Sequence, residues 1–400
     1  MIVISIHLYG HQKFMSNLVL ITGGAGFIGQ NISRALLASG YKVRIIDNFS
    51  PQIHSNDKLP NDLNDNVEII KADIRDSDAM KRALVDVDCL VHLAAETGTG
   101  QSMYEIERYF SVNVQGTAAM LDLIQNNNCG HSLKSIVLAS SRAVYGEGAY
   151  HCLEHGQVFP NLRTRENMSR GLFDPICPVC ASSISLLPTI ESAPFMPMSM
   201  YGLTKQVQEQ SVLLFARTRG INGFGLRYQN VYGPGQSLKN PYTGILAVFS
   251  NLARQNQGIQ IYEDGLESRD FVYIDDVVEA TIRSVNFSGQ FIGALNVGSG
   301  QASSVISVAQ EVKTFFDSSS SIDVTGDFRM GDIRHNIADL SKLKQVLDFI
   351  PRTPFKQGIA KFLDWAAEQA PPNKHAYLQS VNELSEHGLM GKIQAHSSLK

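Results

Sequence analysis

The sequence lacks a basic excess and a long apolar run. Of its 400 residues, 34 are Lys or Arg and 38 are Asp or Glu, so the formal net charge is −4. A protein that binds nucleic-acid duplexes normally carries a basic surface, so this balance argues against nucleic acid as a partner. No apolar stretch reaches the roughly 18 residues of a membrane span, so we expect no membrane segment.

The N-terminus also lacks the features of a signal peptide. Residues 1–14 have neither a charged start nor a small-residue cleavage site. Met15 begins MSNLVLITGG, which resembles a natural start, so we expect residues 1–14 to be an extension without a role in the fold. Together these absences predict a cytoplasmic protein.

Cysteine is scarce as well, with five in the chain. An odd number in a chain of this length is a poor disulfide framework. Three of the five, at positions 152, 177 and 180, are close together in the sequence and are considered below. The hydrophobic fraction of 44% is enough to bury a core, so the chain is not expected to be disordered.

A nucleotide-binding motif is present near the N-terminus. An apolar run of strand length (NLVLIT, 17–22) precedes the glycine-rich segment GGAGFIG at 23–29, and a helical pattern follows as far as Gly40. Gly23 allows a tight turn, Gly26 allows a pyrophosphate to approach, and Gly29 allows the helix to pack closely on the sheet. The helix N-terminus then offers amide donors to phosphate groups.

An acidic residue ends the strand that comes next. Residues 42–47 (KVRIID) form this strand, and Asp47 stands 18 residues after Gly29. Its carboxylate can accept hydrogen bonds from ribose hydroxyls and would repel a 2′-phosphate. The pattern therefore predicts NAD as the cofactor rather than NADP.

Strand and helix patterns alternate along the rest of the chain. This alternation predicts an α/β fold with a doubly wound parallel sheet of the Rossmann type. The expected strands are 67–70, 89–93, 135–138 and 223–226, and the expected helices include 76–84, 106–126 and 199–218. The predicted division is an NAD-binding domain over 15–230 with an insert at 149–196, a smaller substrate-binding domain over 231–267 and 289–367, a return to the first domain over 268–288, and a loosely held polar tail over 368–400.

A tyrosine and a lysine stand four residues apart on the helix predicted at 199–218. This spacing places the Tyr201 and Lys205 side chains on one face. A neighbouring ammonium stabilises a phenolate, so we expect Lys205 to lower the pKa of Tyr201. Ser141 directly follows a predicted strand, at the edge where doubly wound folds bind ligands.

Eight motifs in this order resemble those of the extended short-chain dehydrogenases/reductases, in particular the nucleotide-sugar epimerase and dehydratase branch. They are TGGAGFIG (22–29), ADIRD (72–76), HLAA (92–95), NVQGT (113–117), SSRAVYG (140–146), YGLTK (201–205), LRYQNVYGPG (226–235) and RDFVYIDD (269–276). The resemblance covers roughly residues 17–365. It implies a homodimer formed through the helices that carry Asn113 and Tyr201.

The resemblance also implies a role for each matched residue. Tyr201 would be the catalytic acid/base, Lys205 its activator, and Ser141 the hydroxyl that binds the reacting oxygen. Asn230, Arg269 and Arg334 would hold the diphosphate of a nucleoside-diphosphate sugar, where arginine suits phosphate oxygens. The implied cofactor-binding residues are Gly23, Gly26, Phe27, Ile28, Gly29, Asp47, Asn48, Asp73, Ile74, Leu93, Ala94, Ala95, Asn113, Tyr201 and Lys205.

The residues after Ser141 bear on the reaction. Related dehydratases have an Asp-Glu pair here and related decarboxylases a glutamate, whereas this chain has Arg142-Ala143. We therefore expect an NAD-dependent 4-epimerase that acts through a transient 4-keto sugar. Two alternatives stay open: a nucleotide-4-keto-sugar reductase, and a non-catalytic dinucleotide-binding module.

An insert of unusual length separates Ser141 from Tyr201. It contains Cys152 and His155 and, further on, Cys177 and Cys180. Two such pairs predict a zinc-ribbon-like structural zinc site. Among relatives with this insert, those with a segment similar to GQSLKNPYTGILAVF (235–249) resemble dTDP-L-rhamnose 4-epimerases, which suggests a dTDP-6-deoxyhexose as substrate.

Overall fold

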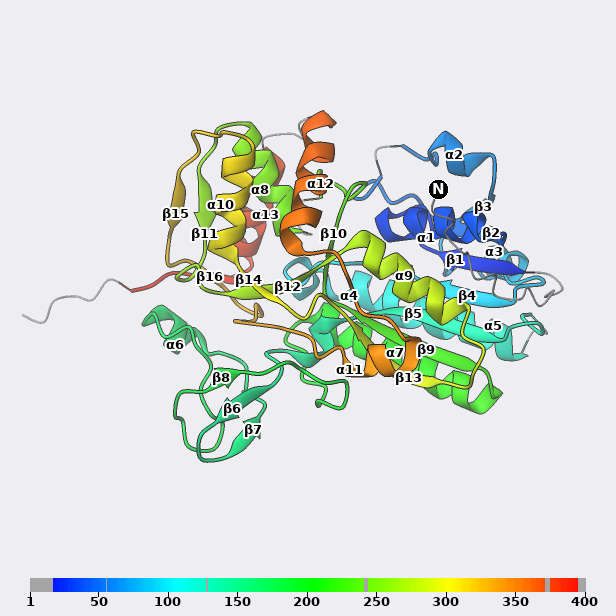
Figure 1. Cartoon of the computed structure of the whole chain (residues 1–400), viewed down its shortest axis with the longest axis horizontal. Helices are drawn as coiled ribbons and strands as arrows, with labels where there is room; N and C mark the ends of the chain where they lie inside the picture. Colours follow the sequence, from blue (N-terminus) through cyan, green and yellow to red (C-terminus); the bar gives the residue numbers. More distant parts are fainter. Residues whose placement is uncertain (1–16, 55, 127–128, 241–243, 371–374, 395–400) are drawn as a thin grey trace, which may run out of the picture.

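The computed structural model describes residues 17–54, 56–126, 129–240, 244–370 and 375–394. Its centre is a parallel sheet of seven strands (Figure 1) in the order β13-β9-β5-β4-β1-β2-β3. The sheet confirms the predicted doubly wound α/β fold. Its strands are β1 (Leu18–Thr22), β2 (Lys42–Asp47), β3 (Glu68–Lys71), β4 (Cys89–His92), β5 (Ser135–Ser141), β9 (Asn222–Tyr228) and β13 (Ile292–Val297).

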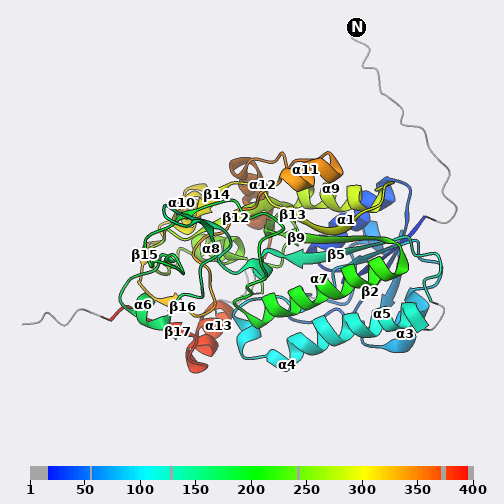
Figure 2. The ribbon, with the colours of Figure 1, turned by 90° about the horizontal axis from the view of Figure 1, so that it is seen from below.

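Both faces of this sheet are buried under helices, which explains the continuous apolar runs of its strands. Val19 and Ile21 point to the face covered by α1 (Phe27–Ala38), α9 (Ile274–Val285) and α11 (Ser341–Leu347). Leu18 and Leu20 point to the other face, which α3 (Ser77–Ala83), α5 (Thr117–Asn126) and α7 (Met200–Arg219) cover. Figure 2 shows these two helical layers on opposite sides of β5 and β9.

The helix predicted over 106–126 is not regular. It consists of α4 (Ile106–Tyr109), a π-helical stretch η2 (Phe110–Gly116) and α5. Short helices elsewhere are α2 (Asn61–Asn64), η1 (Gln101–Met103) and η3 (Arg142–Tyr145). The π-helical stretch carries Asn113, and such stretches are often found at functional sites.

A second hydrophobic core lies beyond the carboxyl ends of the central strands. Helices α8 (Ile245–Arg254), α10 (Val305–Phe315) and α12 (Phe355–Glu368) pack together there (Figure 1). Short strands complete this region: β10 (Asn230–Tyr232), β12 (Ser268–Tyr273) and β14 (Ala302–Ser304) in one sheet, and β11 (Ile259–Ile261) with β15 (Ile322–Val324) in another.

The insert forms a small unit that protrudes from the body. Strands β6 (Tyr150–Cys152), β7 (Gly156–Val158) and β8 (Ser185–Leu186) make an antiparallel sheet, and α6 (Arg165–Ser169) lies in the long connection between β7 and β8. Its own core is small and contains Tyr150, Cys152, Val158 and Cys177.

The C-terminal segment is more ordered than expected. Residues 375–386 form α13 (His375–Glu386), and β17 (Met390–Gly391) pairs with β16 (Phe328–Arg329). The Leu384 side chain is 5% exposed, and the Tyr104 hydroxyl donates a hydrogen bond to Glu383. The expected loose tail is therefore wrong for residues 375–391, because the polar composition hid an amphipathic helix. The predicted extension at 1–14 lies outside the described residues.

Among the described residues, no helix is both long enough and apolar enough to cross a membrane. The longest helix in the described part of the chain is α7. Its buried face is partly polar, since it includes Lys205, Gln208 and Glu209.

Candidate active site

The glycine-rich turn lies between β1 and α1, as predicted. Gly23 has φ +67°, and a Cβ there would lie 2.8 Å from the Ala94 nitrogen. A Cβ at Gly29 would lie 2.6 Å from the Gly24 Cα, so the helix packs directly on the turn. Gly26 precedes the first helical residue, and a Cβ there would meet only the Gly23 carbonyl oxygen, at 3.3 Å. The turn therefore leaves an open approach to the N-terminus of α1, which suits a pyrophosphate.

Asp47 ends β2 beside this turn. One carboxylate oxygen accepts a hydrogen bond from the Ala25 backbone nitrogen at 3.0 Å, and the other accepts one from Phe49 at 2.8 Å. Each oxygen has two lone pairs, so both can still accept from a ribose hydroxyl. The glycine-rich turn, the N-terminus of α1 and the Asp47 carboxylate together form a site that fits NAD.

The residues expected around the adenine also lie near this edge. Asn48 donates a hydrogen bond to Asp73 at 3.1 Å, and Asp73 pairs with Arg75 at 2.7 Å. Ile74 is 5% exposed and packs under Gly116. Leu93, Ala94 and Ala95 follow β4 and are half-buried, whereas Phe27 and Ile28 pack against the second core.

The predicted catalytic side chains meet where β5 ends and α7 begins. Ser199 caps α7 by accepting a hydrogen bond from the Gly202 nitrogen at 3.1 Å, so Tyr201 lies in the first turn. Ser141 lies close enough to the Tyr201 hydroxyl to lower its pKa. The Lys205 Nζ lies 6.0 Å from the centre of the Tyr201 ring and donates to the Ala139 carbonyl at 2.9 Å. The structure thus brings all three together.

The charge states of this group differ from the expectation. Burial lowers the pKa of Lys205 to about 7, and burial raises the pKa of Tyr201 above its ordinary value. Ser141 and the charge of Arg142 act to lower the Tyr201 pKa, whereas Lys205 has no such effect. The predicted lysine effect fails because the buried amine has no carboxylate to keep it charged and is directed to a carbonyl.

Asn113 has a positioning role in the structure, and its predicted contact with the cofactor stays a prediction. It is fully buried, its oxygen accepts from the Glu96 nitrogen at 2.7 Å, and its amide donates to the Glu96 carbonyl and to the Thr204 hydroxyl. Its hydrogen-bonding capacity is therefore used to tie the loop after β4 to α7, next to the catalytic pair.

A pocket opens beside the second core, and Arg142, the neighbour of Ser141, is one of the residues that line it. Asn230 and Arg269, the predicted substrate ligands, also line it. Arg269 is held by hydrogen bonds to the carbonyls of Ser268, Ile333 and Arg334. The other polar lining residues include Thr99, Gln260, Tyr262, Glu263, Glu267, Arg329, Asp332, Tyr377 and Ser380.

Arg334 does not line this pocket. Its side chain is 2% exposed and pairs with Asp264 at 2.6 Å, Asp174 at 2.7 Å and Glu263 at 3.1 Å. The prediction that Arg334 contacts the substrate is therefore not met, because three carboxylates already occupy its guanidinium. Arg329, five residues earlier, lines the pocket instead and stacks on Tyr262 at 4.7 Å. Arg329 lies in β16, which pairs with β17, whereas the carboxylates of Asp174, Glu263 and Asp264 hold Arg334 away from the pocket.

Helix α13 also contributes pocket residues that were not predicted from the sequence. Tyr377, Ser380, Val381 and Leu384 all come from the segment expected to be a loose tail. Their spacings of three and four residues could have predicted a helix here, since such spacings place side chains on one helical face.

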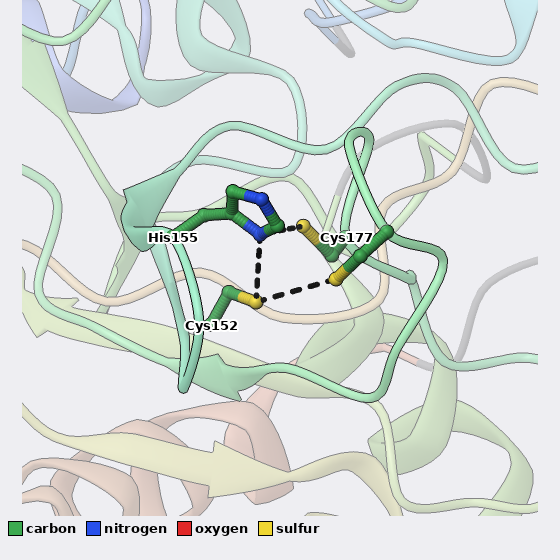
Figure 3. Close-up of side chains that lie close together, drawn as sticks. Cys152, His155 and Cys177 are labelled. Atoms are coloured by element: carbon green, nitrogen blue, oxygen red, sulfur yellow. Dashed lines mark hydrogen bonds between the residues drawn. The ribbon is translucent and has the colours of Figure 1, made fainter.

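The four predicted metal ligands of the insert converge. Figure 3 shows Cys152, His155 and Cys177 turned toward one another. The Cys152 Sγ lies 3.6 Å from the His155 Nδ1 and 3.6 Å from the Cys180 Sγ, and the Cys177 Sγ lies 3.8 Å from the same Nδ1. All four candidate ligand atoms lie within 4.8 Å of one another.

Comparison with known proteins adds a family and close relatives. A family model described as the NAD dependent epimerase/dehydratase family matches residues 19–164 and 179–298, so its gap falls inside the insert. A curated dTDP-L-rhamnose 4-epimerase from Burkholderia thailandensis is 39% identical over 354 residues, which cover 88% of this chain and 95% of the relative.

Two solved structures share the fold and part of the sequence. The UDP-glucose 4-epimerase of Thermotoga maritima, solved with UDP-glucose, is 27% identical with a TM-score of 0.70 and covers 88% of this chain and 99% of its own. The UDP-N-acetylglucosamine 4-epimerase of Methanobrevibacter ruminantium, solved with UDP-N-acetylmuramic acid, is 29% identical with a TM-score of 0.70 and covers 89% and 100%.

Proposed function

The chain belongs to the NAD dependent epimerase/dehydratase family, and from this premise we propose that it is an NAD-dependent nucleotide-sugar 4-epimerase. The observation that carries the proposal is the group of Ser141, Tyr201 and Lys205, followed by an arginine and an alanine where elimination or decarboxylation would need an acid. We further propose a dTDP-6-deoxyhexose as substrate, which the 39% identical dTDP-L-rhamnose 4-epimerase supports.

The chain's residues divide the work as follows. The glycine turn and α1 would bind the NAD pyrophosphate, Asp47 the adenosine ribose and Lys205 the nicotinamide ribose. The chemistry that NAD would supply when bound is reversible hydride transfer at the sugar C4. Tyr201 would take the proton from the 4-hydroxyl as a phenolate, a form that Ser141 and the charge of Arg142 favour and that burial opposes. It would later give the proton back, which is general acid–base catalysis. Ser141 would bind the same oxygen. Helix α7 places the Tyr201 and Lys205 side chains on one helical face.

The reaction leaves no net change in the cofactor, and this separates it from the reductase alternative. Incubation of the purified protein with a panel of nucleotide sugars and no added cofactor should produce 4-epimers that NMR detects. Stoichiometric consumption of NADH or NADPH with a keto sugar would instead support the reductase.

We also propose that Cys152, His155, Cys177 and Cys180 bind one structural zinc. Zinc–sulfur bonds of ~2.3 Å in a tetrahedron separate the sulfurs by about 3.8 Å, close to the 3.6 Å between Cys152 and Cys180. The residue after each pair, Gly156 and Ala181, has positive φ (66° and 57°), so both pairs lie on tight turns. Four protein ligands leave no open position, which favours a structural role.

Finally, we propose that two copies pair through the α4-η2 segment, which carries Asn113, and through α7, which carries Tyr201. Leu203, Leu214 and Ile106 are 36%, 59% and 43% exposed on these neighbouring helices. Leu214→Glu should turn a dimer into a monomer in light scattering, and a wild-type monomer would refute this pairing.

A further inference from the structure

Arg142 lies at the reactive end of the pocket. It is the first residue of η3 and directly follows Ser141 at the carboxyl end of β5. Its guanidinium lines the same pocket as Asn230 and Arg269. It also interacts electrostatically with both Tyr201 and Arg269, so its charge lies near the catalytic tyrosine and near an expected diphosphate ligand.

The other cations around this pocket have partners. Arg163 pairs with Glu263 at 2.8 Å, and Arg329 lies 3.5 Å from Asp332. Arg269 is bound to backbone carbonyls. Within the described parts of the chain, the Arg142 side chain has neither a hydrogen bond nor a carboxylate at ion-pair distance. Asp332 and Glu147 act on it only over a longer range.

A partly buried cation without a partner is costly unless a ligand compensates it. Burial and the nearby Arg269 lower the pKa of Arg142 to about 10, so it still carries its charge at neutral pH. Arg142 and Arg269 line the same cavity. Because the Arg142 guanidinium has no hydrogen-bond partner among the described residues, it can bind phosphate oxygens in a bidentate manner.

The order of groups in the substrate identifies the anion. In a nucleoside diphosphate sugar, the β-phosphate is the phosphate attached to the sugar, and the sugar must reach Tyr201 to react. We propose that Arg142 binds the β-phosphate of the substrate and so fixes the sugar against Tyr201. This inference rests on the proposed function. It assigns a role in substrate binding to Arg142, which stands where related dehydratases and decarboxylases have an acid.

The test compares nucleotides that differ by one phosphate. Calorimetric titrations of dTDP and dTMP, and of UDP and UMP, are made with the wild-type protein, Arg142→Met, Arg142→Lys and a control, Arg219→Met. Arg219 is exposed at the far end of α7, remote from Ser141 in the fold. Bound NAD and the melting temperature are measured for each variant.

We expect Arg142→Met to weaken diphosphate binding by about 10- to 100-fold, as for the loss of a charged hydrogen-bonding partner, and monophosphate binding by less than ~3-fold. Arg142→Lys should retain part of the affinity, and Arg219→Met all of it. Equal losses for both nucleotide types, or no loss for either, would overturn the β-phosphate assignment. If Arg142→Met does not fold, Arg142→Lys and Arg142→Gln carry the same comparison. Failure of the wild-type protein to bind either diphosphate would instead refute the proposed function.

Discussion

At the scale of single residues, replacing Tyr201 and replacing Lys205 should have different effects on turnover and on bound NAD. Tyr201→Phe should reduce turnover by at least ~100-fold, as for a lost general acid/base, and leave bound NAD unchanged. Lys205→Met should also lower bound NAD. Because burial lowers the folded-state pKa of Lys205 from its ordinary value of 10.5 to about 7, its charged form is destabilised in the fold. Below pH 7 the ammonium opposes folding, so this variant should not lower the melting temperature at pH 6.

Near-normal turnover of Tyr201→Phe would contradict its assignment as the acid/base. A Lys205→Met protein that melts well below the wild type would show that the lysine serves the fold.

Glu267 predicts a pH dependence of substrate binding. It lines the pocket, one of its carboxylate oxygens is buried without a hydrogen bond, and burial together with Glu263 raises its pKa to about 7, while Arg269 and Arg334 oppose this. An acid with a raised folded pKa is neutral below that pKa and repels an anionic ligand above it. Its contribution to stability is likewise present below the unfolded pKa of about 4.5 and is lost as the pH rises through about 7.

The binding of dTDP-glucose to Tyr201→Phe should therefore weaken between pH 6 and pH 8 by several-fold, up to the tenfold that 1.4 kcal/mol represents. Adding Glu267→Gln should abolish the change. A pH profile unaffected by Glu267→Gln would assign the titration to another group.

At the scale of elements, the insert links the proposed zinc site to the substrate pocket. Arg163 lies between the two cysteine pairs in sequence and bridges Glu147 at 3.1 Å and Glu263 at 2.8 Å. Asp174 pairs with Arg334 at 2.7 Å, and Arg165 donates to the carbonyls of Gly388 and Met390. The insert therefore contacts both the pocket wall and the segment that follows α13.

Loss of the metal should loosen these contacts and leave the NAD site intact. The insert follows β5, whereas the glycine turn follows β1 and Asp47 ends β2, on the other side of β4 in the sheet. Metal analysis should find about one zinc per chain, and Cys177→Ser should lose it. Limited proteolysis of this variant should begin within 150–196 while bound NAD is retained, and Cys129→Ser serves as the matched control outside the cluster. A zinc-free wild-type protein with an ordered insert would contradict the proposal.

At the scale of the whole molecule, much of the central sheet follows from the sequence. Alternate residues of β1 face opposite buried layers, and this burial on both faces produces the apolar runs that predict the strands. The glycine-rich turn, α1 and Asp47 lie close to one another in the sequence, so a site for NAD could be predicted from their pattern. The cysteine pairs could be predicted to converge because thiolates at such spacings favour one metal.

Contacts between distant segments could not be predicted in the same way. Arg329 and Arg334 are five residues apart, and the carboxylates of Asp174, Glu263 and Asp264 decide which of them faces the pocket. The direction of the Tyr201 pKa depends on burial, which residue spacing does not contain. The role of α13 was hidden because its pocket-facing side chains are few within a polar segment.

The central claim is epimerisation at C4 without net redox change. The most direct measurement follows dTDP-L-rhamnose and a panel of other nucleotide sugars by NMR, with purified protein and no added cofactor. A 4-epimerase should form a new 4-epimer that grows to a fixed ratio with the substrate, while enzyme-bound NAD is unchanged at the end. Loss of water from the sugar, or conversion only when NADH or NADPH is supplied in stoichiometric amount, would contradict it.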